Sequence, residues 1–233
     1  MPRSDEARDL PGFRLRGREV TRLESFSDAV FGFALTLLVV SLDVPKSFND
    51  LIATMRGFPA FAICFLLLVV IWNSHYKFCR RYGLDDGTVR FLTCVLLFLV
   101  LFYVYPLKFL FNLSVTGLLL GAGPPISMTG SQLSTLLVIY GLGFAAVYGA
   151  LTLIYFHAYR LSDSLGLSGL ERFDTRYIIF RLLTVASFGV LAAILALIPG
   201  VRNWSGLIYL LLFPTLRTSR VVHARRREQY RRP

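Results

Sequence analysis

The sequence predicts an all-α integral membrane protein with six transmembrane helices, and three observations support this fold class. Hydrophobic residues make up 55% of the 233 residues, and charged residues only 17%. The mean hydropathy of +0.60 is too apolar for a domain whose surface must face water. Apolar runs of roughly 20 residues recur along the chain, and that length crosses a bilayer core at about 1.5 Å per residue. We therefore expect a single membrane domain over residues 1–233.

Six apolar segments, separated by charged residues, proline and glycine, define the expected helices. They cover residues 25–44, 58–78, 89–111, 133–157, 176–198 and 203–217. A basic N-terminal segment, residues 1–22, precedes the first helix and lacks the apolar core of a cleavable signal, so we expect this helix to be retained. The sixth segment is short and contains Pro214, so it either crosses the membrane or packs shallowly on its neighbours.

The basic residues lie mostly on one side of this arrangement. Six crossings place 21 of the 25 Lys and Arg residues on the same side and leave Lys46, Arg56, Lys108 and Arg202 on the other. By the positive-inside rule, this asymmetry predicts that both termini are cytoplasmic and favours six crossings over five. We expect residues 121–134 to form an uncharged outer loop. We expect the basic tail, residues 218–233, to be a solvated segment that orients the protein or contacts anionic lipid head groups.

Composition and motifs exclude several classes of protein. The net charge of +11 would suit nucleic-acid binding, but the basic residues flank hydrophobic runs and no soluble stretch is long enough for a recognition module. The three cysteines, Cys64, Cys79 and Cys94, have neither CxxC spacing nor clustered histidines, which predicts neither a zinc site nor a disulfide framework. Nothing resembles a nucleotide-binding loop or a Ser/His/Asp arrangement. We therefore expect no enzymatic activity, no metal, no cofactor and no nucleic-acid partner.

Polar residues near the cytoplasmic ends of the first two helices are the first candidates for function. Asp28 lies in or at the mouth of the first helix, where an acid costs about 3 kcal/mol unless it is hydrated or paired. One alternative is that Ser27 or Asp28 caps the helix, and another is that Asp28 lies at head-group depth. Trp72 and His75 close the second helix at the same depth, so Asp28, Arg22 and His75 could form a hydrogen-bonded set. Alternatively, Trp72 belongs to the interfacial belt and His75 snorkels.

An apolar stripe runs along the first helix. Phe33, Leu37 and Val40 share one face by i, i+4, i+7 spacing, and Thr36 lies beside them. Periodicity alone cannot distinguish a pore lining from ordinary helix packing, and by itself it favours packing.

Small residues recur at four-residue spacing in two later helices. Gly141, Ala145 and Gly149 form one ridge, and Gly189 with Ala193 forms another. Such ridges let helix backbones approach closely, so we interpret both as packing surfaces.

The stretch Arg22–Val40 reads RLESFSDAVFGFALTLLVV and contains a Phe-Ser-Asp motif at residues 26–28. Trp72 and His75 have Trp-x-x-His spacing and are followed by basic residues. These features resemble the prokaryotic relatives of the lysosomal potassium channel transmembrane protein 175. The resemblance covers residues 22–108, with Gly32 in place of the usual alanine and Thr93 where asparagine is common.

The resemblance implies a homotetrameric, passive, potassium-preferring cation channel in the cell membrane of a prokaryote, with potassium as the permeant ion. Four six-helix subunits would surround a pore lined by the first helix. By position, Phe33 would form the narrowest hydrophobic ring, Leu37 and Val40 the next rings, and Thr36 the neighbouring polar position. The residues implied in a hydrogen-bonded belt that holds pore helices and subunits together are Arg22, Ser27, Asp28, Trp72 and His75.

Two other functions remain open from the sequence. The first is a proton-conducting or proton-coupled transporter in which Asp28 and His75 titrate. The second is a membrane scaffold that transports nothing, which follows if four phenylalanines at position 33 close the pore permanently.

Overall fold

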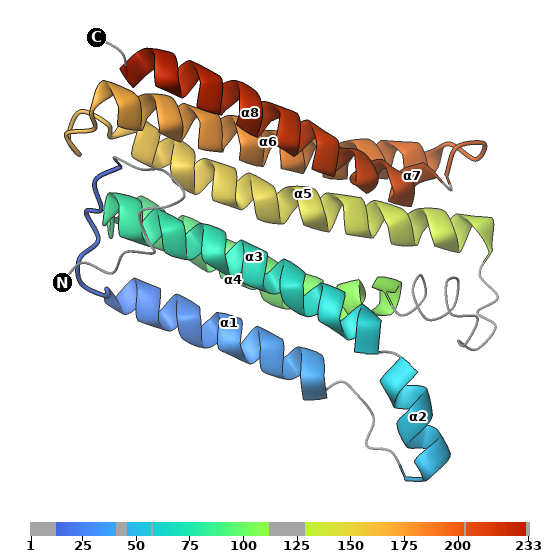
Figure 1. Cartoon of the computed structure of the whole chain (residues 1–233). Coiled ribbons are helices and arrows are strands. Elements are labelled where there is room, and N and C mark those ends of the chain that lie inside the picture. Colours follow the sequence, from blue (N-terminus) through green and yellow to red (C-terminus); the bar gives the residue numbers. More distant parts are fainter. Residues whose placement is uncertain (1–12, 41–45, 57, 112–128, 203, 232–233) are drawn as a thin grey trace.

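The structure, a computed structural model, describes residues 13–40, 46–56, 58–111, 129–202 and 204–231, and all regular secondary structure in these ranges is helical. Figure 1 shows the helices as long, roughly antiparallel rods, with both chain ends at the same end of the bundle. The elements are α1 (Arg22–Val40), α2 (Phe48–Arg56), α3 (Phe58–Tyr82), α4 (Gly87–Phe111), α5 (Gly130–Arg160), α6 (Gly169–Leu197), α7 (Trp204–Leu207), the 3₁₀ helix η2 (Ile208–Leu211) and α8 (Leu212–Arg231).

The predicted fold class, an all-α membrane protein, is confirmed. Among the described residues, α3, α5, α6 and residues 87–104 of α4 are long and apolar enough to span a membrane. Two further antiparallel helices flank these four: α1 packs against α3 and α4, and α8 packs against α6. The helices therefore follow one another across the subunit, with α1 at one edge and α8 at the other (Figure 1). The predicted outer loop falls largely outside the described residues.

Two helical segments, the start of α6 and the whole of α2, lie outside the helices that the sequence predicted. The fifth predicted helix was expected from residue 176, but α6 begins at Gly169. Its start is a capping box, in which the Ser168 hydroxyl accepts from the Glu171 N–H and the Glu171 carboxylate accepts from the Ser168 N–H. The short helix α2 was not predicted at all, because nine residues give too little periodicity to stand out.

The segment before α1 is fixed across the ends of two later helices. The Gly17 N–H donates to the Arg80 carbonyl at the end of α3 (3.1 Å). Arg16 makes a two-pronged ion pair with Glu171 of α6, with both N–O distances 2.9 Å. A side chain at Gly17 would place its Cβ 2.3 Å from the Cys79 carbonyl oxygen, so only glycine allows this approach. The start of α1 is therefore tied to both halves of the bundle.

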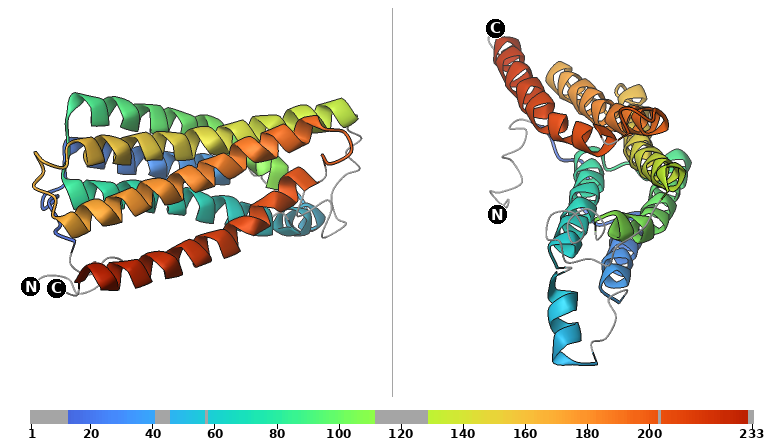
Figure 2. Two further views of the ribbon diagram at one scale, coloured as in Figure 1. Left: turned by 90° about the horizontal axis from the view of Figure 1, so that it is seen from above. Right: turned by 90° about the vertical axis from the view of Figure 1, so that its right-hand side faces the viewer.

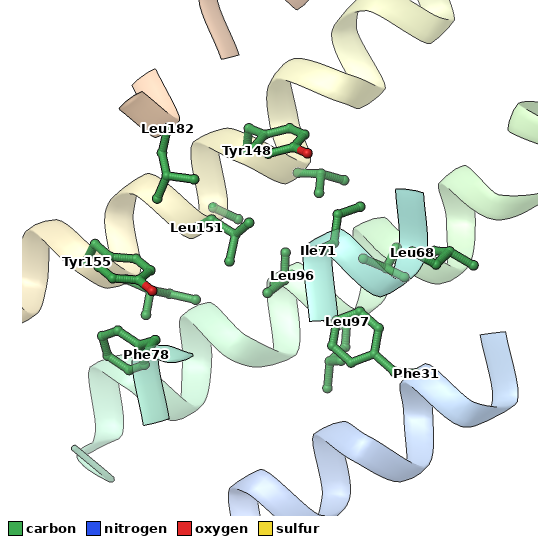
Figure 3. Close-up of a cluster of buried hydrophobic side chains, with 14 of the residues drawn as sticks. Phe31, Leu68, Ile71, Phe78, Leu96, Leu97, Tyr148, Leu151, Tyr155 and Leu182 are labelled. Carbon is green, nitrogen blue, oxygen red and sulfur yellow. The ribbon is translucent and has the colours of Figure 1, made fainter. Parts of the chain in front are cut away.

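The core fills the space between α3, α4 and α5. Phe78, Tyr82 and Tyr155 form an aromatic cluster with ring centroids 5.2, 5.3 and 5.8 Å apart. Both tyrosine hydroxyl groups of this cluster are satisfied, since Tyr155 donates to the Ser74 carbonyl (2.9 Å) and Tyr82 bonds the Thr175 hydroxyl (2.8 Å). Figure 3 shows the cluster continuing through Leu96, Leu97, Leu151 and Leu182 toward Phe31 of α1.

The two predicted small-residue ridges are packing surfaces, as expected, and the structure shows that they pack against each other. A Cβ on Gly141 would lie 2.6 Å from the Gly189 carbonyl oxygen and 2.8 Å from the Ala193 N–H nitrogen. A Cβ on Gly189 would lie 2.6 Å from the Gly141 carbonyl oxygen. Gly149 was included in the ridge but does not need to be glycine, because nothing lies within 4 Å of its Cβ position. Thus the backbones of α5 and α6 approach closely at Gly141 and Gly189 but not at Gly149.

We expect Gly141→Ala to destabilise the protein by about 1–3 kcal/mol, because the added methyl group meets backbone atoms that cannot move aside. The matched control is Gly149→Ala on the same helix, which should be neutral or stabilising by about 0.5–1 kcal/mol through helix propensity. Thermal unfolding in detergent measures both. Equal stability of the two variants would contradict the close approach of α5 and α6.

The C-terminal tail was expected to be solvated; its described part, residues 218–231, is helical and docked at two buried residues, while most of its other side chains are exposed. Residues 212–231 form α8, and Pro214 is accommodated because it lies in the first turn of this helix. Arg227 donates to both carboxylate oxygens of Asp174 on α6, with Nε at 2.9 and 3.0 Å and Nη2 at 2.8 Å. Asp174 is completely buried, and Arg227 is 9% exposed. The His223 ring stacks on Tyr177 at 3.8 Å between centroids. The tail is therefore docked by a buried ion pair.

Candidate functional site

The first helix presents two different faces. Phe31, Ala34 and Leu38 are 3%, 0% and 1% exposed, and they form the face that packs on α3 and α4. The Thr21 hydroxyl accepts from the Glu24 N–H (3.1 Å) and caps the helix. The alternative that Ser27 or Asp28 is the cap is therefore wrong, because the helix begins more than one turn earlier.

The predicted pore stripe lies on the other face. Phe33 is 67% exposed and Leu37 53% exposed within the single chain, and Thr36 is exposed beside them. The Thr36 hydroxyl donates to the Gly32 carbonyl (2.9 Å), so its hydrogen is satisfied within α1. Val40 is the last helical residue, and its side chain lies outside the described residues. This face of α1 has no packing partner among the described parts of its own chain.

Asp28 is held by a polar ladder between α1 and α3. The Trp72 indole N–H donates to Asp28 Oδ1 at 2.7 Å. The Trp72 ring stacks on Tyr76 (5.6 Å between centroids), and the Arg80 guanidinium lies 5.4 Å from the centre of the Tyr76 ring. Arg80 also pairs with the buried carboxylate of Glu24, at 3.5 Å. The contributing residues are four apart on each helix and the helices are antiparallel. Asp28 therefore faces Trp72, and Glu24 faces Arg80.

Within one chain, the other residues of the predicted hydrogen-bonded belt do not contact Asp28 through a described hydrogen bond. The Ser27 hydroxyl donates to the Leu23 carbonyl of its own helix (2.7 Å). His75 is 1% exposed, and its Nε2 lies 3.3 Å from the Thr93 hydroxyl of α4. Arg22 is exposed at the first residue of α1. The structure therefore brings Asp28 and Trp72 together, whereas Ser27 and His75 bond elsewhere.

Sequence reasoning missed three members of this ladder, namely Glu24, Tyr76 and Arg80. Glu24 is 3% exposed even though it lies in the first turn of the helix, a place where acids are common and give little signal. The spacing of Trp72, Tyr76 and Arg80 at i, i+4 and i+8 was the available signal, since it places one aromatic-to-basic row on a single face of α3.

We expect Trp72→Phe to destabilise the protein by about 1–2 kcal/mol, because phenylalanine keeps an aromatic ring but lacks the indole N–H that donates to Asp28 in the described ladder. Trp204→Phe is the control, because Trp204 is 64% exposed on α7, far from this ladder. Thermal unfolding in detergent measures the difference. A Trp72→Phe variant as stable as Trp204→Phe would show that the hydrogen bond contributes nothing.

Metal chemistry finds no support at this site. Across the described ranges, no group of three or more His, Cys, Asp or Glu residues is placed to hold a metal ion. The arrangement instead combines an exposed apolar helix face with a polar anchor at one end of it.

Several known proteins are similar to this chain in sequence and in architecture. Residues 22–103, which comprise α1, α2, α3 and most of α4, match the family model described as endosomal/lysosomal potassium channel TMEM175. A potassium channel of Marivirga tractuosa is 41% identical over 218 residues, which cover 88% of each chain. A potassium channel of Streptomyces collinus is 30% identical over 94 residues, covering 38% of this chain and 46% of the relative.

Two crystal structures share the fold. The first is a variant of the potassium channel MtTMEM175 in complex with a nanobody fusion protein, which matches with a TM-score of 0.81 and 38% identity over 94% of this chain and 98% of that one. The second is a lysosomal potassium-selective channel TMEM175 homologue from Chamaesiphon minutus. It matches with a TM-score of 0.60 and 23% identity over 85% of this chain and 96% of that one, which indicates a shared fold.

Proposed function

The chain belongs to the family of the endosomal/lysosomal potassium channel TMEM175, and on this basis we propose that it forms a homotetrameric, potassium-preferring channel whose pore is lined by α1. The family is one of ion channels, not enzymes. In the proposed assembly Phe33, Thr36, Leu37 and Val40 of four subunits face the axis. Both termini lie in the cytoplasm, where most of the basic residues would then be found.

The observation that carries this proposal is the exposed face of α1. Phe33 and Leu37 are more than half exposed, while the opposite face of the helix is fully packed. Lipid could cover an apolar stripe, but Arg22 and Asp28 are also exposed on this helix. Charged side chains facing hydrocarbon are costly, whereas a pore or a subunit interface gives them water or partners. The position of α1 at one edge of the subunit supports the same assembly (Figure 1).

Passive conduction is expected because the stripe is mostly apolar. Apolar rings bind no ion tightly, so an ion passes by losing part of its hydration shell and leaves again without a coupled ion. Potassium loses its water more easily than sodium does, which favours potassium at such a constriction. Phe33 is the largest side chain of the stripe and would form its narrowest ring.

Flux measurements on proteoliposomes test the proposal. Vesicles containing the purified protein should release potassium down an imposed gradient faster than they release sodium, and protein-free vesicles should release neither. Flux no greater than that of protein-free vesicles at any imposed voltage would reject a conducting pore. Equal potassium and sodium flux would leave a cation channel but reject the potassium preference.

The proton-coupled alternative is not favoured, and Asp28→Asn separates the two functions. If the protein is a channel, Asp28 is structural: it holds α1 against α3 of the same chain through Trp72, so we expect Asp28→Asn to loosen α1 and thereby to weaken assembly. Chemical cross-linking and size-exclusion chromatography measure the oligomer. A variant that assembles normally but loses all transport would favour a titrating role for Asp28. His75 is a poorer proton carrier than expected, since it is buried against Thr93.

A further inference from the structure

A groove of about 990 Å³ lies between α6 and α8, on the side of the subunit away from α1. Figure 2 shows α8 running alongside α6 toward the end of the bundle where both chain termini lie. The apolar part of the lining includes Phe180, Pro214 and Val222, of which Phe180 is 59% and Val222 45% exposed. Two exposed arginines, Arg176 and Arg226, also belong to the lining, together with polar side chains that include Thr218, Ser219 and His223.

The charge in this groove is confined to one end. Arg176 lies two turns into α6, whereas Phe180 lies one turn further from the end that carries the termini. On α8 the order is reversed along the chain, with Pro214 near the beginning and Arg226 near the end. The two arginines therefore share the terminal end of the groove, and the apolar residues line the part that extends toward the middle of the bundle.

The buried ion pair keeps this groove in shape. Arg227 and Asp174 join α8 to α6 next to Arg226 and Arg176, and the His223 ring stacks on Tyr177. Because these contacts fix the spacing of the two helices, Arg176 and Arg226 stay on the rim of the groove and do not depend on the ligand for their position.

We propose that this groove binds an anionic phospholipid of the cytoplasmic leaflet, with its phosphate at Arg176 and Arg226 and its acyl chains along Phe180 and Val222. The polarity of the groove matches that of such a lipid, charged at the membrane surface and apolar within. Figure 1 shows α8 on the opposite side of the subunit from α1, so with α1 at the pore axis α8 would face outward, where lipid is the neighbour. The inference rests on the orientation proposed above but not on ion conduction.

Native mass spectrometry of the full chain tests the inference without measuring flux. Delipidated protein is offered equal amounts of phosphatidylglycerol and phosphatidylcholine with identical acyl chains. The wild type should retain phosphatidylglycerol preferentially. The double variant Arg176→Gln with Arg226→Gln should lose that preference by roughly 25-fold, since each basic residue near a membrane surface contributes about fivefold.

The matched control is Arg217→Gln with Arg225→Gln, which removes the same charge from exposed positions of α8 outside the groove lining. This control should retain phosphatidylglycerol as the wild type does. Thr215→Trp fills the apolar part of the groove while leaving every charge in place, so it should also lose the lipid.

Four results would overturn the proposal. Wild-type retention in the Arg176→Gln with Arg226→Gln variant, or equal loss in the control, would show that binding is diffuse. Displacement of the lipid by soluble glycerol phosphate at equal concentration would show that the groove takes a free phosphate. A disulfide between the Val222→Cys positions of two subunits would show that a second copy covers the groove. None of these results bears on conduction, so failure here leaves the channel proposal intact.

Discussion

Arg227→Met is expected to destabilise the protein by about 3–5 kcal/mol, because it removes the permanent positive charge from the buried Asp174 carboxylate and leaves only the His223 ring, 3.1 Å from Oδ1, beside it. Asp174 is 0% exposed, and two nitrogens of Arg227 lie within 3.0 Å of its oxygens. Methionine retains much of the packing volume of arginine, so the loss of stability measures the effect of removing the charge. Thermal unfolding in detergent measures the effect, and limited proteolysis should show early cleavage of α8.

The control is Arg225→Met, which changes an exposed arginine on the same helix and should cost little. A second test is the pair Asp174→Leu with Arg227→Met. Removing both charges should recover most of the lost stability, because replacing a buried ion pair by apolar residues is often nearly neutral. If the Arg227→Met and Arg225→Met variants unfold at the same temperature, the docking of α8 does not depend on the ion pair.

The second large effect is expected in conduction. Phe33→Ala should raise potassium flux by on the order of tenfold, which corresponds to a barrier lowered by about 1.4 kcal/mol. The physical reason is that a ring of four phenylalanines excludes water from a narrow pore, and alanine widens and wets it. The preference for potassium over sodium should fall at the same time, because a wider ring lets either ion keep its water. Flux into proteoliposomes measures both quantities.

Phe98→Ala on α4 is the matched control. Phe98 is 68% exposed and Phe33 67% exposed, so the same substitution removes the same ring from an equally open position that is not on α1. Its flux should equal that of the wild type. Flux in the Phe33→Ala variant alone would place Phe33 at a closed gate. Equal flux in the wild type, Phe33→Ala and Phe98→Ala would show that Phe33 does not line the conduction path.

Several features were determined by the sequence alone because they depend on local length and hydropathy. The α-helical membrane fold and the family were predicted from apolar runs and from the motif around Asp28, and both are confirmed. The Gly141 and Gly189 ridges were predicted from four-residue spacing and do pack together. The tetramer and the roles of the pore residues stay predictions, because both concern contacts between copies of the chain.

Tertiary structure decided the contacts that depend on which helices are neighbours and at what depth their residues lie. Trp72 is 44 residues from Asp28, and Arg227 is 53 residues from Asp174. No local pattern links such partners, because their distance depends on the packing and register of whole helices. For the same reason the sequence assigned the basic tail to solvent by its charge. Folding instead buries one of its arginines on a carboxylate, since a paired charge can be buried where an isolated one cannot.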